Sequence, residues 1–226
     1  MKIRFFSCEL EGIIGFDLEI LSPQATIQDY LDGLNQLIEA GEFTRGRSTV
    51  KECAGCDGCC AERIPLTNID IFRLRQIPVV SGNNLTEILS YCAQIDLEPP
   101  LVDIFLKRDE AGTCIFLHKE AKRCKNYNHR PLVCQTFICC PTTERAQALR
   151  SLIVNSGEDE LVRLWLMESF LNEKLSTQNN GLTKLNLTDW EENLFTGKVN
   201  YDQVLIKDLC SEKLWLELAP RENCHS

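Results

Sequence analysis

The chain has 226 residues, of which 44% are hydrophobic and 25% are charged, a composition typical of a globular protein rather than a disordered one. Its 33 acidic side chains exceed its 24 basic ones, and the net charge of −9 argues against nucleic acid as a partner, because phosphate recognition requires a basic surface. No run approaches the ~18 apolar residues of a membrane-spanning helix, so we expect no contact with a membrane.

Cysteine is unusually abundant in this chain, which has 13 cysteines but only 3 histidines, and any proposed function has to account for them. The first residues, MKIRFFSCELEG, lack the unbroken apolar core and the cleavage site of a signal peptide, which predicts a cytoplasmic protein. Thiols are kept reduced in that compartment. A cysteine-dense chain therefore indicates metal or redox chemistry rather than a disulfide framework.

Residues 1–48 are predicted to form a small ββα unit. Apolar and acidic residues alternate from Phe16 to Ile20, the pattern of a half-buried strand, and an earlier strand precedes it across a glycine-containing turn. Thr26 and Asp29 have the spacing of a capping box that begins a helix, and Gly41 is placed to end it. We interpret this unit as a packing or protomer-contact module.

Residues 49–141 form the cysteine-rich central segment. A capping box that begins at Thr67 predicts one helix, and a second helix is expected over about residues 84–95. Residues 101–107 are predicted as a strand, with residues 114–117 as its return partner in a β-hairpin.

Residues 142–226 are predicted to be helical. An apolar stripe over residues 146–171 is interrupted at 155–157, so we expect two helices there, then a short helix that ends at Gly197 and another over about 201–218. The expected fold is therefore α+β. It comprises a small N-terminal ββα unit, a central metal-stapled cysteine-rich domain with short helices and a β-hairpin, and a C-terminal helical segment.

The strongest motif is Cys53-Ala-Gly-Cys56-Asp-Gly-Cys59-Cys60, with four cysteines in eight residues. Gly55 and Gly58 give the backbone the freedom that a tight loop needs to turn several sulfurs toward one point. Such a density of thiols indicates metal ligation rather than packing.

A second group of cysteines follows at Cys114, Cys124, Cys134 and Cys139, with Cys140-Pro141 directly after it. Residues 119–130 contain five basic side chains and one acidic one, which predicts a basic collar that lowers the pKa of the thiols. The spacing C-x₂-C-x₂-C is typical of iron–sulfur proteins and favours a cluster such as 4Fe-4S. A zinc site of four cysteines remains the alternative.

These motifs resemble those of the YkgJ-like CxxCxxCC family, whose proteins are described as zinc- or iron-chelating and which includes a flagellin lysine N-methylase branch. The resemblance spans about residues 53–140 and also includes Leu66-Thr67, Asp70-Ile71, Gly112, Tyr127, Arg130, Pro131 and Phe137. It implies eight metal ligands: Cys53, Cys56, Cys59, Cys60, Cys114, Cys124, Cys134 and Cys139. Which of Cys59 and Cys60, and which of Cys139 and Cys140, binds metal stays open.

Five further cysteines depart from the family pattern: Cys8, Cys92, Cys140, Cys210 and Cys224. Cys92 lies on an apolar helix face and is expected to be buried as a small hydrophobic residue, and Cys8 and Cys210 are interpreted in the same way. Arg130 is expected to hold carbonyl or carboxylate groups beneath the second cysteine loop.

Three functions remain possible on this sequence. The first is a metal-binding protein that holds one or two iron–sulfur clusters through eight cysteines, for electron transfer, sensing or cluster-dependent modification of a protein. The second is a zinc-stapled, non-catalytic interaction protein with a protein partner. The third, a protein lysine N-methyltransferase, is implied only by the flagellin branch of the family. No phosphate-binding loop, dinucleotide-binding motif or H-E-x-x-H motif points to another activity.

Overall fold

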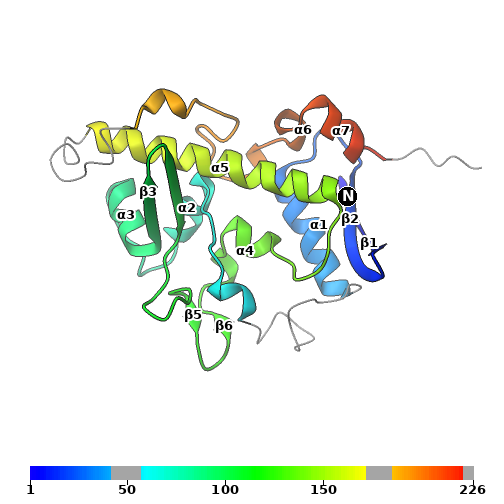
Figure 1. The fold of residues 1–226 in the computed structure, drawn as a ribbon, viewed down its shortest axis with the longest axis horizontal. Coiled ribbons are helices and arrows are strands. Elements are labelled where there is room, and N and C mark those ends of the chain that lie inside the picture. Colours follow the sequence, from blue (N-terminus) through cyan, green and yellow to red (C-terminus); the bar gives the residue numbers. More distant parts are fainter. Residues whose placement is uncertain (42–56, 172–184, 221–226) are drawn as a thin grey trace, which may run out of the picture. The chain divides into compact units, whose positions relative to one another are not determined.

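The computed structural model describes residues 1–41, 57–171 and 185–220. It confirms the predicted α+β class, with helices and three two-stranded antiparallel sheets (Figure 1). The chain divides into two compact units of non-contiguous segments, unit 1 (1–49, 136–153 and 200–226) and unit 2 (50–135 and 154–199). No helix among the described residues combines the length and the apolar character needed to cross a membrane.

Unit 1 contains the predicted ββα arrangement. Strands β1 (Ile3–Leu10) and β2 (Ile13–Ile20) pair along their full length, and helix α1 (Ile27–Ala40) follows (Figure 1). The capping box of Thr26 and Asp29 begins α1, and Gly41 ends it in the left-handed region with φ of 70°. The expected elements are therefore confirmed.

One face of the hairpin packs on α1 through aromatic contacts. The ring of Phe5 lies 5.3 Å from that of Tyr30 and 6.1 Å from that of Phe16, measured between ring centroids. The prediction that β2 is half-buried is wrong, because Asp17 and Glu19 on its other face are buried too. They are paired with Arg145 and Arg4, and such pairing is what makes buried carboxylates tolerable.

The chain segment before α5 (Glu144–Leu171) lies along the outer edge of β2. The Phe16 amide donates to the Pro141 carbonyl over 3.1 Å, and the Thr143 amide donates to the Phe16 carbonyl over 3.3 Å. A β-carbon on Gly15 would lie 2.3 Å from the Pro141 oxygen, so only glycine permits this approach.

The C-terminal part of unit 1 consists of short pieces rather than the single helix expected over 201–218. They are the 3₁₀ turn η5 (Tyr201–Gln203), α6 (Ile206–Leu209) and α7 (Glu212–Leu218). Backbone pairing explains the first break, between η5 and α6, since the Ile27 amide donates to the Val204 carbonyl and the Ile206 amide donates to the Ala25 carbonyl. These extended contacts fix the polypeptide between the short helices.

Helix α5 is continuous, so the predicted interruption at residues 155–157 is wrong. The prediction rested on the low helix propensity of glycine, which destabilises a helix by about 1 kcal/mol relative to alanine. Close packing explains why glycine occupies this position in the helix. A β-carbon on Gly157 would lie 2.7 Å from the β-carbon of Thr67 and 3.0 Å from the ring of Phe195. The glycine lets these parts of unit 2 approach α5 closely.

Unit 2 begins with the 3₁₀ turn η1 (Gly58–Ala61) and the two expected helices, α2 (Asn68–Leu74) and α3 (Leu85–Cys92). Thr67 and Asp70 form the capping box of α2, as predicted. The second helix ends earlier than expected, because Ala93–Glu98 forms strand β3.

The predicted hairpin has a different partner strand. The expected strand is present as β4 (Leu101–Leu106), and its ladder partner is β3, across the Pro99–Pro100 turn. The predicted return of residues 114–117 is confirmed only just beyond β4, where Arg108 and Cys114 form an isolated antiparallel bridge and the Ile115 amide donates to the Lys107 carbonyl over 3.2 Å. Those residues lead into a separate small hairpin, β5 (Leu117–His118) and β6 (Arg123–Cys124). Because β3 was not predicted, residues 114–117 were assigned as the partner of the whole strand, although their pairing is with the residues that follow β4.

The remaining elements of unit 2 are short. They are the 3₁₀ turn η2 (Tyr127–His129), helix α4 (Leu132–Thr136), whose last residue belongs to unit 1, and the 3₁₀ turn η4 (Leu187–Asp189). The helix expected to end at Gly197 is absent from the described residues 185–199, where turns follow η4. The Asn193 side chain holds these turns by donating to the Ser156 carbonyl and accepting from the Phe195 amide.

Candidate metal centre

The structure brings together the predicted ligands that lie in unit 2, which are Cys59, Cys60, Cys114, Cys124 and Cys134. They come from η1, the turn before β5, strand β6 and helix α4. All five residues are half-buried. Cys139 belongs to unit 1, where it is also half-buried, and Cys53 and Cys56 lie outside the described residues.

Backbone hydrogen bonds fix Cys114 beside the η1 turn. The Cys114 amide donates to the Cys60 carbonyl over 2.8 Å. Next to this bond, the Arg108 guanidinium donates to the Ala61 carbonyl over 3.1 Å. Two cysteines that are more than fifty residues apart in the sequence are thus held together by the main chain, independently of any ligand.

The β5–β6 hairpin positions Cys124 close to Cys114. Leu117 in β5 pairs with Cys124 in β6. The Leu117 amide also donates to the Cys114 carbonyl over 3.0 Å, and the Lys125 amide donates to the Phe116 carbonyl over 2.8 Å. The hairpin therefore turns the chain back so that both cysteines lie at one end of it.

Asp70 anchors the helix that carries Cys134. Its side chain is fully buried, and one carboxylate oxygen caps α2 by accepting from the Thr67 amide over 2.9 Å. The other oxygen accepts from the Leu132 amide at the start of α4 over 2.8 Å. The sequence pointed to Asp70 only as the cap of α2. Its hydrogen bond to the start of α4 could be recognised only in the tertiary structure, although Asp70 is one of the residues that carry the family resemblance.

We expect replacement of Asp70 by alanine to lower the free energy of unfolding by about 3 kcal/mol, since it removes a helix cap and a buried charge-assisted hydrogen bond. It should also lower metal occupancy, because α4 carries Cys134. Urea unfolding and metal analysis measure the two effects. Asp29→Ala is the matched control: Asp29 holds the equivalent position in the capping box of α1 but makes no bond to α4. Equal effects of the two variants on metal occupancy would contradict this role of Asp70.

Arg130 has the structural role expected from the sequence. Its Nε donates to the Tyr127 carbonyl over 3.2 Å, and its guanidinium lies 3.7 Å from the centre of the Tyr127 ring. Its own carbonyl accepts from the Gln135 side chain over 2.7 Å. These contacts join the turn after Cys124 to helix α4 and place a positive charge near the cysteines.

Cys59 and Cys60 differ in how readily they ionise. The Cys60 thiol donates a hydrogen bond to Cys59, and this bond, together with the Arg130 charge, lowers the pKa of Cys59 to about 6. The same bond, burial and the charges of Cys59 and Cys114 raise the pKa of Cys60 far above its ordinary value. Cys59 is therefore the thiol of this turn that ionises first, and thiolate is the metal-binding form.

The remaining thiols lie close enough together to oppose one another's ionisation. Burial is the largest cause of the raised pKa values of Cys114, Cys124 and Cys134, and the charge of Cys59 raises all three further. Several like charges at short range cannot form together unless a cation compensates them. A bound metal would supply that compensation.

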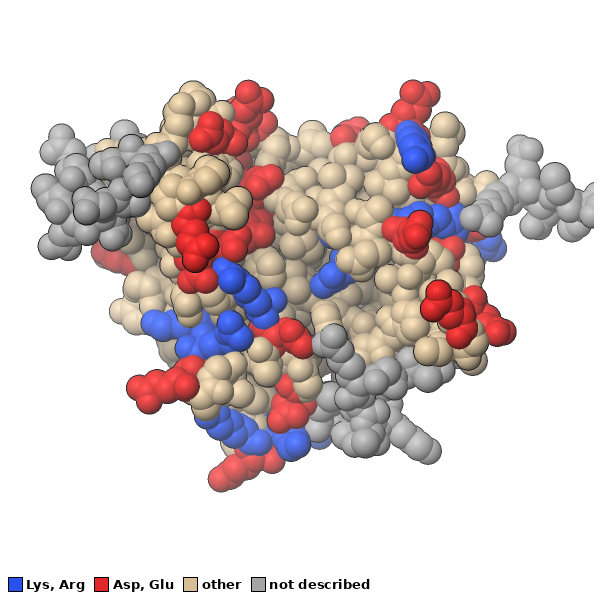
Figure 2. Space-filling model, in the orientation of Figure 1, with Lys and Arg blue, Asp and Glu red and all other residues tan. Residues whose placement is uncertain are grey.

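The predicted basic collar is only partly present around these thiols. Lys119 pairs with Asp109 over 2.7 Å, and Lys122 lies 3.7 Å from Asp57, so their charges are compensated elsewhere on the surface. Figure 2 shows Lys and Arg side chains interspersed with Asp and Glu side chains over the end of the molecule that holds β5 and β6. Arg130 is the basic residue of this segment that lowers the pKa of Cys59 and of Cys124.

Within the described parts of the chain, no three Cys, His, Asp or Glu side chains converge closely enough to hold one metal ion. Those parts exclude Cys53 and Cys56, two of the four cysteines in the first motif. The donor set itself fits, since cysteine thiolates bind both zinc and iron–sulfur clusters. The residues that would hold a metal are thus the described thiols together with cysteines of the first motif.

Of the remaining cysteines, Cys92 has the environment expected for it. It is fully buried in α3, its thiol donates to the Ile88 carbonyl, and burial raises its pKa to about 12. Cys8 and Cys210 were expected to be buried in the same way, but both are only half-buried; partial burial raises the pKa of Cys210 to about 11 and raises that of Cys8. Cys140 is half-buried, and Cys224 lies outside the described residues.

Comparison with known proteins agrees with this geometry. Residues 52–152 match the family model CxxCxxCC, described as "Putative zinc- or iron-chelating domain". Neither the curated proteins nor the solved structures that were compared gave a match. The resemblance predicted from the sequence is thus confirmed over residues 52–152, and the description of the matching family model supports metal binding by this domain.

Proposed function

We propose that the protein binds an iron–sulfur cluster through its family cysteines, and that the cluster serves electron transfer or sensing in the cytoplasm. The observation that carries this proposal is the proximity in unit 2 of thiols from η1, the turn before β5, strand β6 and helix α4, since charge on Cys59 raises the pKa of Cys114, Cys124 and Cys134. Backbone bonds and the buried Asp70 hold these segments together. Cysteine side chains that oppose one another's ionisation in this way would be stabilised as thiolates by a shared cation.

Hydrogen bonding to the sulfurs supports a cluster rather than a simple zinc staple. Nearby backbone amides favour the thiolate forms: those of Phe116 and Leu117 act to lower the pKa of Cys114, and that of Asn126 acts to lower the pKa of Cys124, against the larger effect of burial. Amide hydrogen bonds to sulfur are among the factors that set the potentials of iron–sulfur clusters. The C-x₂-C-x₂-C spacing at Cys53, Cys56 and Cys59 points the same way.

The eight family cysteines match two four-cysteine sites in number, or one site with supporting thiols. The residues proposed to bind metal are the eight that the family pattern implies. When bound, an iron–sulfur cluster supplies one-electron chemistry. The chain supplies the thiolate donors, the amide hydrogen bonds to sulfur and the nearby Arg130 charge.

The test is purification without oxygen, followed by measurement of iron, acid-labile sulfide and zinc, with a visible spectrum. We expect a brown protein with broad absorbance near ~400 nm, as thiolate-bound iron gives, and equal amounts of iron and sulfide. A colourless protein with stoichiometric zinc that is stable in air would overturn the cluster and leave the zinc-stapled interaction protein. Absence of both metals would overturn metal binding itself.

A further inference from the structure

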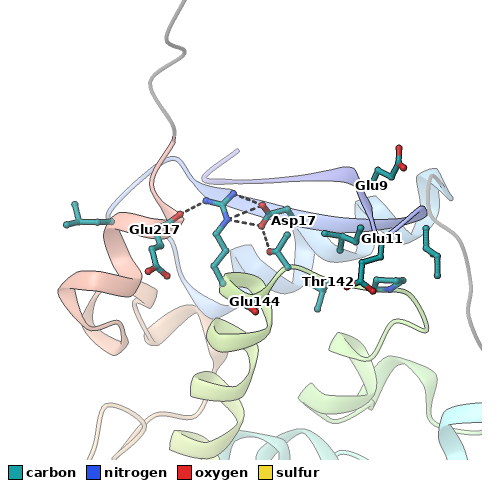
Figure 3. Close-up of a pocket in the computed structure, with 12 residues that line it drawn as sticks. Glu9, Glu11, Asp17, Thr142, Glu144 and Glu217 are labelled. Carbon is teal, nitrogen blue, oxygen red and sulfur yellow. Dashed lines mark hydrogen bonds and ion pairs between the residues drawn. The ribbon is translucent and has the colours of Figure 1, made fainter.

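Unit 1 contains a pocket that the metal centre does not use. It has a volume of about 1020 Å³ and lies between the end of the β1–β2 hairpin, the start of α5 and the last turn of α7 (Figure 3). Its lining draws on segments that are far apart in the sequence, including Glu9–Glu11, Pro141–Arg145 and Leu216–Glu217. The fold therefore builds it from three separate elements of one unit.

The lining of this pocket is acidic. Five carboxylates take part, those of Glu9, Glu11, Asp17, Glu144 and Glu217. The Arg145 guanidinium neutralises Asp17, and Lys213 on α7 lies 3.9 Å from Glu217, which leaves the charges of Glu9, Glu11 and Glu144 for a ligand. Figure 2 shows Asp and Glu side chains gathered near the end of the β1–β2 hairpin, the part of unit 1 that carries Glu9 and Glu11.

Apolar side chains lie among these charges. Ile13 is 44% exposed at the hairpin end and Leu216 is 65% exposed on α7, and Leu10 completes the apolar part of the lining. A partner that covered these side chains would remove their apolar surface from water, which is favourable. The site thus offers both charge and apolar contact.

The arrangement of the carboxylates selects the kind of ligand. In Figure 3, Glu9 and Glu11 lie at one end of the pocket and Glu217 at the other, with Asp17 and Glu144 between them. Nowhere in the described parts of the chain do three such side chains converge to hold a metal ion. Negative charges spread over a long, open surface complement positive charges spaced along an extended chain, not a single ion.

We propose that this pocket binds an extended segment of a partner protein in which lysine or arginine side chains alternate with apolar ones. The cationic side chains contact Glu9, Glu11 and Glu144, and the apolar ones cover Ile13 and Leu216. The proposal does not rest on the metal centre, because every residue of the pocket belongs to unit 1.

The test uses the full-length protein and a fluorescein-labelled octapeptide of alternating lysine and valine, with binding followed by fluorescence anisotropy. The probe should bind, and its affinity should fall when the salt rises from about 50 mM to about 500 mM, because ions screen surface charge. A matched peptide of alternating glutamate and valine should not bind. Equal binding of both peptides would overturn the charge complementarity, and no binding of the lysine peptide would overturn the site.

Variants then locate the binding. The triple variant Glu9→Gln, Glu11→Gln and Glu144→Gln changes exposed carboxylates into neutral side chains of the same shape. It should lower the affinity for the lysine peptide roughly tenfold. The control variant carries Glu39→Gln, Asp202→Asn and Glu212→Gln, exposed carboxylates of unit 1 outside the pocket, and should bind as the wild type does. Equal weakening in both variants would show non-specific attraction and overturn the proposal. Thermal unfolding of both variants establishes that each is folded.

Discussion

Replacement of Cys134 by serine is expected to remove at least nine tenths of the bound metal. Cys134 lies on α4, which Asp70 anchors, and its thiol is among those that oppose one another's ionisation. A hydroxyl binds zinc and iron–sulfur clusters far more weakly than a thiolate does. Because metal binding contributes directly to folding in small metal domains, the variant should also unfold at lower temperature. Metal analysis after gel filtration, together with thermal unfolding, measures both effects.

Cys92→Ser is the matched control. Cys92 is fully buried in α3, and a serine there can still donate to the Ile88 carbonyl as the thiol does. We expect this variant to keep its full metal content and to lose about 1 kcal/mol of stability, the ordinary cost of placing a hydroxyl in an apolar site with one hydrogen bond. If Cys134→Ser kept its metal, or if Cys92→Ser lost it, the ligand assignment would be contradicted.

The elements that the sequence predicted well are those with local signals. Thr26 with Asp29 and Thr67 with Asp70 each form a capping box, and each helix begins where its box predicts. The alternation along β2 likewise identified a strand, because a period of two residues is an intrinsic property of a strand. Such features depend on neighbours in the sequence and can be recognised without the tertiary structure.

The mistaken predictions arose where a distant contact decides the structure. Gly157 was interpreted as a helix break, but it lies within α5 because Thr67 and Phe195 pack against it. The helix predicted to pass through Ile95 ends at Cys92, since the residues from Ala93 onward pair with β4. A sequence window contains neither partner, so local propensity favoured the wrong state at both places.

The candidate site shows the same division. The eight proposed ligands were selected from spacing and family resemblance alone, and five of these cysteines lie in the described part of unit 2. The second bond of Asp70 and the stacking of Arg130 on Tyr127 could not be derived, because they join segments that are separated in the chain or depend on side-chain orientation. Burial of Asp17 was also missed, since its partner Arg145 lies more than a hundred residues away.

Arg145→Ala is expected to lower the free energy of unfolding by about 3–5 kcal/mol at pH 7, the usual effect of leaving one charge of a buried pair without its partner. Arg145 is buried, and its guanidinium donates to both carboxylate oxygens of Asp17, with the shortest distance 2.7 Å (Figure 3). It also donates to the Glu217 carbonyl, so one side chain joins β2, α5 and α7. Urea unfolding gives the loss directly. The double variant Asp17→Asn with Arg145→Met is the control and should lose less, because no buried charge remains.

The pH dependence separates this electrostatic effect from a simple loss of packing. Burial alone would raise the pKa of Asp17, but the hydrogen bonds from Arg145, Thr143 and the Leu18 amide outweigh it and hold the pKa below its ordinary value. In the wild type, this contribution to stability is complete above the unfolded pKa of about 3.9 and is lost as the pH falls through the lower folded pKa. Without Arg145, burial becomes the main influence on Asp17 and raises its pKa in the folded protein. Protonation of Asp17 in acid should then remove the unpaired buried charge and restore part of the variant's stability. The stability difference between wild type and Arg145→Ala should therefore be smaller at pH 4 than at pH 7, whereas a loss of packing alone would give the same difference at both.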